Sequence, residues 1–145
     1  VTFSNVVKRG LSNIEIEGLL QYEPGFQGCF MRNETLPKHG SFILNLDDVS
    51  GLGTHWVAVF PDRNIYYDSY GLKWPNELDH FGLKEYNSIQ HQRMNSNLCG
   101  LYCIVVIKLI NKGISFYNIC YDIFKHSKHN KNDGTFKHLL YEMQK

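Results

Sequence analysis

Apolar residues are concentrated most strongly between positions 98 and 110, where they fall around the whole circumference of a helix rather than on one stripe. This pattern predicts a helix that is buried on most sides. Asn97 is its expected N-cap, and Gly113 is the expected C′ residue. Cys99 would then lie in the first turn of a central helix, where unpaired backbone N–H groups and the positive end of the helix dipole favour a thiolate.

A second helix is predicted over residues 11–22. Ser12 and Glu15 have the spacing of a capping box, and Ile14, Leu19 and Leu20 would form the inward face. The stretch that follows, 26–40, is rich in turn-forming residues, so we expect an irregular loop there.

Residues 41–46, 54–60 and 65–70 have the β-branched and aromatic content of strands, and the short connections between them predict an antiparallel meander. A further strand is expected over 84–91, and helical segments over 76–81, 115–126 and 134–143. The predicted class is therefore α+β, with a small, mostly antiparallel sheet packed against the buried central helix. We expect one domain that spans residues 1–145.

Composition and charge exclude several classes of protein. With 145 residues, of which 43% are apolar, the chain is large enough to fold around a core. Its 15 basic and 14 acidic residues nearly balance, which argues against a strongly basic nucleic-acid-binding protein. No apolar run approaches the roughly 18 residues of a membrane span, and no signal peptide is visible. Because the chain begins at Val1 rather than Met, we expect a processed product, a domain of a longer protein or an incomplete chain.

The cysteine pattern bears on the compartment. Cys29, Cys99, Cys103 and Cys120 are scattered, and the spacing of the middle two matches neither a zinc finger nor a thioredoxin-type motif. We therefore expect free thiols in a reducing intracellular compartment.

Histidines give only a weak indication of a metal site. His126 and His129 lie in the basic segment KHSKHNK, where no third ligand is evident, so an exposed loop without metal is expected.

Three short signals become informative together. His55 lies in a predicted strand, Asp68 lies in the next one, and Cys99 begins the central helix. If the two strands pair, a carboxylate can hold one imidazole nitrogen while the other faces the thiol, which is a Cys–His–Asp nucleophilic site. Gln92 and the backbone N–H of Cys99 would then donate to a developing oxyanion.

Each residue alone has an ordinary structural explanation. His55 could be a half-buried strand residue, Asp68 a turn former before a glycine, and Cys99 a small core residue. Gln92 alone carries almost no information. It is the combination of the four, in this order along the chain, that favours catalysis.

The segments GTHWVAVF, IYYDSYG and QRMNSNLCGLYC resemble the adenain family of adenovirus maturation proteases and its relatives in virophages and Maverick-type elements. The wider clan includes the proteases of SUMO and ubiquitin-like proteins. The resemblance runs from about residue 11 to about residue 112. It implies a papain-like, Ulp-type cysteine protease fold without a cofactor. Asp68 departs from adenain, which has Glu at this place, and is closer to the deSUMOylase pattern.

By that resemblance, Cys99 is the nucleophile, His55 the general base, Asp68 its orienting carboxylate and Gln92 the oxyanion donor. The resemblance also places Trp56, Asn45 and Gly100 beside a narrow substrate cleft that favours glycine near the scissile bond.

The implied activity is a cysteine endopeptidase that cleaves capsid or core precursors during virion maturation. The alternatives are a deconjugating isopeptidase acting on SUMO- or ubiquitin-like modifiers, and a non-catalytic peptide-binding relative. We expect a monomer that acts in a virus factory, cytoplasm or nucleus, or inside the virion. Adenain is stimulated by DNA and by a thiol-linked peptide, but the charge balance gives little support for DNA, and the other three cysteines are expected in the core.

Overall fold

The computed structural model describes residues 1–46, 55–93, 96–124, 132–133 and 136–144. Its elements are helices α1 (Phe3–Arg9), α2 (Asn13–Leu20), α3 (Cys99–Asn111), α4 (Phe116–Asn118) and α6 (Phe136–Met143), and strands β1 (Phe26–Met31), β2 (Ser41–Asn45), β3 (Trp56–Phe60), β4 (Ile65–Tyr67) and β5 (Glu85–Tyr86). Short 3₁₀ helices span Pro61–Arg63 and Asn76–Phe81, and a π-helical turn spans Ile119–Ile123.

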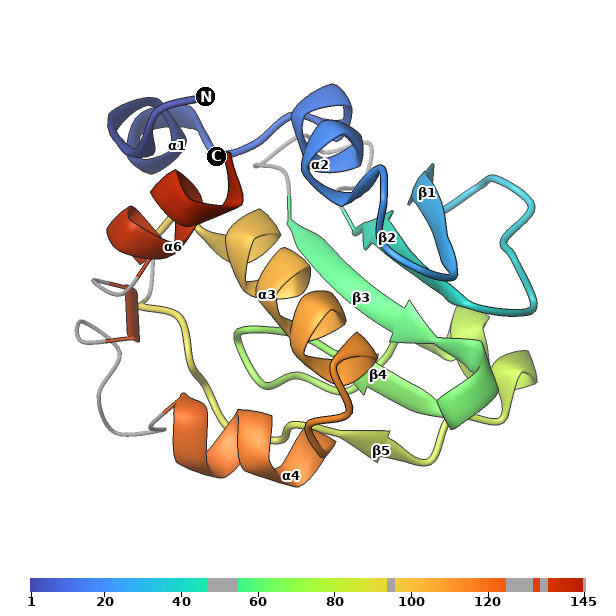
Figure 1. The fold of residues 1–145 in the computed structure, drawn as a ribbon. Helices are drawn as coiled ribbons and strands as arrows, with labels where there is room; N and C mark the ends of the chain where they lie inside the picture. The colour runs from blue at the N-terminus through green and yellow to red at the C-terminus, as the bar shows by residue number, and fades with distance from the viewer. Residues whose placement is uncertain (47–54, 94–95, 125–131, 134–135, 145) are drawn as a thin grey trace.

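The five strands form one sheet in the order β1-β2-β3-β4-β5, and α3 packs across one face of it (Figure 1). The three central strands form the expected antiparallel meander, whereas the edge strands β1 and β5 are parallel to their neighbours. The α+β class and the sheet packed on a buried central helix are therefore confirmed.

Alternate residues of the central strands supply two hydrophobic layers. Ile43, Ala58 and Tyr67 face α3 and belong to the larger cluster, which also contains most of that helix. Phe42 and Val59 face the other way, into a smaller cluster with Leu78 and Leu83. Because both faces of the sheet are covered, β2, β3 and β4 are buried along their whole lengths.

Helix α3 ends as expected, but it begins differently. Lys112 is the C-cap and Gly113 follows with φ 88°, the left-handed conformation that favours glycine at C′. The prediction of Asn97 as N-cap is wrong, because Leu98 occupies that position without a side-chain cap. The Asn97 side chain instead donates to the carbonyls of Val7 and Lys8 at 3.0 and 3.1 Å.

Helix α2 confirms the capping box, with reciprocal hydrogen bonds between Ser12 and Glu15. Its inward face differs from the prediction. Ile14 is 78% exposed, and Ile16 and Leu20 are the buried residues. The helix starts at Asn13, which turns position 14 toward solvent and position 16 toward α3.

Two N-terminal elements were not predicted. Residues 26–31 form strand β1 instead of an irregular loop, because pairing with β2 and packing on α2 outweigh the local turn signals. The ladder is irregular between Phe26 and Cys29, where Gly28 adopts φ 116°. Helix α1, to which the pattern assigned no element, is capped by Thr2, whose hydroxyl accepts from the Asn5 N–H.

Elsewhere the elements are shorter than the ranges predicted from the sequence. Strand β4 stops at Tyr67, and β5 covers two residues of the predicted 84–91. The segment predicted as helix over 115–126 begins as α4 and continues as the π-helical turn, and residues 125–126 lie outside the described residues. The predicted turn at 47–53 lies outside them too. None of the described helices has the length and apolar character needed to cross a membrane.

Candidate active site

Cys99 is the first residue of α3 and is 5% exposed. Its position follows from the fold, because α3 enters the core beside the start of β3. The first backbone N–H groups of this 13-residue helix have no intrahelical partner, so its N-terminus carries partial positive charge next to the sulfur.

The structure brings His55 between a carboxylate and a thiol. The imidazole Nε2 lies 2.8 Å from Asp68 Oδ1, and the side chain also interacts electrostatically with the Cys99 thiol. Because Nε2 contacts Asp68, Nδ1 is the ring nitrogen that remains for the interaction with the Cys99 sulfur. The side chain of His55 is 22% exposed and that of Asp68 is 2% exposed, so the contact is largely shielded from water.

The contacts with Asp68 and Cys99 reverse the effect of burial on the pKa of His55. Burial alone would lower the pKa of the imidazole, but the interactions with Asp68 and Cys99 raise it to about 10. The imidazole therefore carries a proton at neutral pH. A cationic imidazole beside a sulfur favours the thiolate form of a cysteine.

Asp68 is held rigidly by its surroundings. Its backbone N–H donates to Asn87 Oδ1 at 3.1 Å, and its carbonyl accepts from Asn87 Nδ2 at 2.5 Å. Its Oδ1 also accepts from the backbone N–H of Tyr70 at 2.8 Å. These bonds fix the carboxylate before it meets the imidazole, which is the role that an orienting carboxylate requires.

Tyr70 is a residue that the sequence reasoning missed. Its ring stacks on the imidazole of His55, with centroids 4.9 Å apart and planes 26° from parallel. Its hydroxyl donates to the Ser96 carbonyl at 3.3 Å, in the turn before Cys99. The available signal was the position of Tyr70 two residues after Asp68, in a stretch interpreted only as strand.

Gln92 is fully buried near the start of α3. Its Oε1 accepts from Ser69 Oγ at 2.5 Å, and its Nε2 donates to the Ser96 carbonyl at 2.7 Å. An amide nitrogen carries two hydrogens, so one remains after the bond to Ser96. Ser69 thus sets the orientation of the amide, a contribution that the sequence did not indicate.

The three expected substrate-binding residues lie together but differ in surroundings. Trp56 and Asn45 line a pocket of about 420 Å³ between the α1–α2 connection and β1. Trp56 is only 5% exposed, and its indole N–H donates to the Leu11 carbonyl at 3.1 Å. Gly100 is buried beneath it. A Cβ there would lie 3.4 Å from Trp56, Leu11 and Ile16, so core side chains fill the space beside this glycine.

Burial determines the protonation state of the other three cysteines. Burial raises the pKa of Cys29 and of Cys120 to about 12 in each case, and that of Cys103 well above its usual range. These thiols therefore stay protonated at neutral pH. Among the described residues, no group of three or more His, Cys, Asp or Glu could hold a metal ion, and His126 and His129 lie outside those residues.

Comparisons with known proteins add little to this geometry. No family model matches the chain, and no curated protein matches it. Among solved structures, the chain is similar to a selenomethionine crystal structure of the ASFV pS273R protease, at 24% identity and a TM-score of 0.45. The match covers 57% of this chain and 38% of that one, so this chain corresponds to little more than a third of that protease.

Proposed function

We propose that this chain is a cysteine endopeptidase with Cys99 as its nucleophile. The observation that carries the proposal is the position of the His55 imidazole, 2.8 Å from the Asp68 carboxylate and in electrostatic contact with the Cys99 sulfur, which lies 3.5 Å from the backbone nitrogen of the next residue, Trp56. Both contacts come from elements distant in sequence, and the sulfur lies at the start of a buried helix. A structural histidine has no need of this arrangement, whereas nucleophilic catalysis requires it.

The chemistry follows from these contacts. The sulfur of Cys99 attacks the carbonyl carbon of the scissile peptide, and the imidazolium of His55 gives its proton to the leaving amine as the C–N bond breaks. A water molecule then attacks the thioester, with neutral His55 taking the water's proton. The S–C bond breaks, the carboxylic acid leaves, and the thiolate–imidazolium pair is restored.

Gln92 is the proposed side-chain donor to the oxyanion. Three observations support this role. Gln92 is completely buried, its Oε1 is held by the hydrogen bond from Ser69, and its Nε2 keeps one hydrogen after the bond to Ser96. The backbone N–H of Cys99, at the start of α3, is the proposed second donor.

The proposed substrate is a peptide with glycine near the scissile bond, and the proposed targets are capsid or core precursors. The support comes from the residue pattern shared with adenain-like proteases and from the backbone N–H of Trp56, which lies 3.5 Å from the Cys99 sulfur and so places residue 56 beside the nucleophile. In this reading, Asn45 and Trp56 contact the substrate from the pocket that they line.

One observation favours a deconjugating isopeptidase as the second candidate. Asp68 with the following Ser69 is closer to the deSUMOylase pattern than to adenain, and Ser69 donates a hydrogen bond to Gln92 Oε1. Both candidates share the acyl-transfer chemistry and differ in the protein that presents the glycine.

The test is to incubate the protein with a glycine-containing precursor peptide, with a conjugate of a ubiquitin-like modifier, and with a glycine vinyl-sulfone probe. We expect labelling at Cys99, located by peptide mass spectrometry, and cleavage of the precursor peptide. His55→Ala should lower both rates by at least about a thousandfold, since the base and the proton donor are lost together.

His39→Ala is the matched control, because its imidazole is 85% exposed and contacts Asp62 rather than the residues of the candidate site, and its labelling and turnover should equal those of the wild type. Cleavage of the conjugate alone would favour the isopeptidase. Wild-type labelling at Cys29 instead of Cys99, or equal labelling of His55→Ala, would refute the nucleophilic site.

A further inference from the structure

The backbone of Trp56 faces a gap in the sheet. Ala58 pairs with Tyr67, and Phe60 pairs with Ile65, so the polar groups of even-numbered residues in β3 point toward β4. Trp56 is the next in this series, but β4 ends at Tyr67 and provides no partner. A buried backbone N–H or C=O without a partner is costly, so something else must satisfy both groups.

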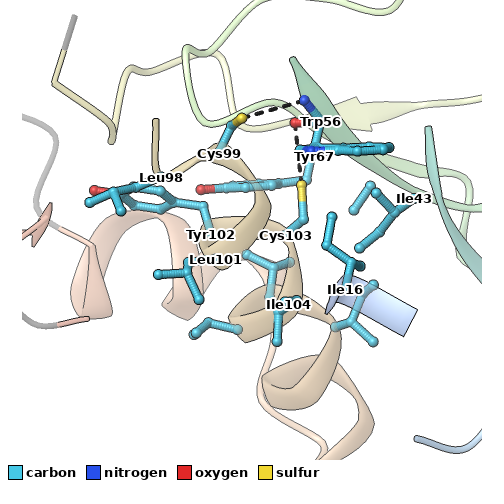
Figure 2. Close-up of a cluster of buried hydrophobic side chains, with 14 of the residues drawn as sticks. Ile16, Ile43, Trp56, Tyr67, Leu98, Cys99, Leu101, Tyr102, Cys103 and Ile104 are labelled. Carbon is cyan, nitrogen blue, oxygen red and sulfur yellow. Dashed lines mark hydrogen bonds between the residues drawn. The ribbon is translucent and has the colours of Figure 1, made fainter. Parts of the chain in front are cut away.

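Two sulfur atoms from α3 provide the hydrogen-bond partners that β4 does not. The Trp56 N–H donates to Cys99 Sγ at 3.5 Å, and the Trp56 carbonyl accepts from Cys103 Sγ at 3.4 Å. Cys99 and Cys103 are four residues apart, so they lie on one face of the helix, one turn from each other. Figure 2 shows the two sulfurs on either side of the same residue, with a dashed line from each to Trp56.

The direction of each bond is fixed by its chemistry. A backbone N–H can only donate, so the sulfur of Cys99 is the acceptor. A carbonyl oxygen can only accept, so Cys103 must donate, and burial keeps its thiol protonated. The two bonds therefore orient residue 56 with its N–H toward the first sulfur and its C=O toward the second.

We propose that the backbone N–H of Trp56 stabilises the ionised sulfur of Cys99, and that Cys103 is a positioning residue that holds Trp56 in place for this contact. The catalytic part of this inference rests on the proposed function. A hydrogen bond to an ionised acceptor is stronger than one to a neutral acceptor, so the Trp56 N–H favours the nucleophilic form. It also fixes the direction from which the sulfur approaches a substrate.

The first measurement observes the bond itself. In ¹H–¹⁵N spectra recorded from pH 5 to pH 10, the Trp56 amide proton should move downfield as the sulfur ionises. In Cys99→Ala the sulfur is absent but His55 remains, so any movement that persists reports His55 alone. An equal movement in the wild type and in Cys99→Ala would overturn the assignment of the Trp56 N–H as a donor.

The second measurement compares Cys103→Ala, which removes the donor, with Cys103→Ser, which keeps a donor of similar size. Iodoacetamide labelling of Cys99 is followed against pH by peptide mass spectrometry. Loss of one neutral hydrogen bond should move the labelling midpoint of Cys103→Ala upward by about half a pH unit. Cys103→Ser should stay close to the wild type.

Cys120→Ala is the matched control, because this thiol is equally buried and has no hydrogen-bond partner among the described residues. Its labelling profile should not move. Superimposable profiles for Cys103→Ala and the wild type would refute the positioning role, and the amide measurement still decides the role of the Trp56 N–H if Cys103→Ala does not fold. Neither readout needs peptide turnover. A protein that shows both signatures but cleaves no peptide would therefore contradict the proposed function and leave this inference standing.

Discussion

At the scale of single residues, Tyr70 links the His55 imidazole to the turn that precedes Cys99. Its ring covers one face of His55, and its hydroxyl reaches the Ser96 carbonyl that also receives Gln92 Nε2. An aromatic face is attractive to a cation, and the contacts of His55 make it one at neutral pH. Tyr70 should therefore affect both the charge and the position of the base.

Substitution of Tyr70 separates these two effects. Tyr70→Phe keeps the stack and loses the hydroxyl bond, so kcat/KM should fall about threefold; Tyr70→Leu loses both and should fall about tenfold. In NMR titration, the pKa of His55 should decrease in the leucine variant and remain unchanged in the phenylalanine variant. Tyr22→Leu, at a site 89% exposed, is the control. An unchanged His55 titration in Tyr70→Leu would contradict a role of the stack.

At the scale of elements, the segment that carries Gln92 is held by a buried polar cage. The His91 side chain bonds the Tyr67 hydroxyl at 2.9 Å and the Cys120 carbonyl at 2.8 Å. Its own carbonyl accepts from Tyr102 at 3.1 Å and from Asn132 at 3.2 Å. Helix α3, β4, the π-helical turn and the C-terminal region therefore all contribute to the placement of one amide.

Tyr102→Phe tests whether this cage supports catalysis. The hydroxyl oxygen also lies 2.5 Å from Asp133 Oδ1, so its one hydrogen is shared between this carboxylate and the His91 carbonyl. Removal of the hydroxyl leaves a buried carboxylate with one partner fewer and should cost about 1.5–3 kcal/mol of stability. If the cage positions Gln92, kcat should fall several-fold while KM changes little. Tyr117→Phe, whose exposed ring stacks on Tyr121, should change neither. A rise in KM with unchanged kcat would contradict the positioning role.

Some helices and strands could be predicted from the sequence and others could not. Elements with strong local signals were predictable: the buried run of α3, the Ser12–Glu15 capping box and the three central strands. Strand β1 was not, because its pairing with β2 is a tertiary contact that overrides the local signals of 26–40. The N-cap prediction failed for a similar reason, since the Asn97 side chain has a partner in α1, nearly 90 residues away in sequence.

At the scale of the whole molecule, the convergence of His55, Asp68 and Cys99 could be predicted from local rules. Pairing of two neighbouring strands brings His55 close to Asp68, and the start of a buried helix gives the position of Cys99. The surroundings of these residues could not. Stacking by Tyr70 and orientation of Gln92 by Ser69 depend on how the chain turns after β4 ends, and no spacing rule gives that path. The proximity of these residues was therefore easier to predict than the contacts that hold them.

The stability of the whole fold should respond to pH through the same imidazole. The pKa of His55 is raised from 6.5 to about 10 by Asp68 and Cys99, against the effect of burial. Below pH 6.5 the folded and unfolded states both hold the proton, and the stabilisation by these contacts is fully present. Between pH 6.5 and about 10 only the folded state holds it, so stability falls as pH rises and the contribution is lost above that range.

Urea unfolding at pH 6, 8 and 10 measures this contribution. The wild type should exceed His55→Gln in stability by the largest margin at pH 6, and the margin should shrink steadily toward pH 10. His39→Gln controls for loss of a histidine, because that side chain is 85% exposed and lies far from the triad in the Asp62 contact. Its margin should vary with pH less than that of His55→Gln, because water screens an exposed contact. Parallel curves for wild type and His55→Gln would mean that the imidazole gains no proton affinity on folding, and the thiolate–imidazolium pair would lose its basis.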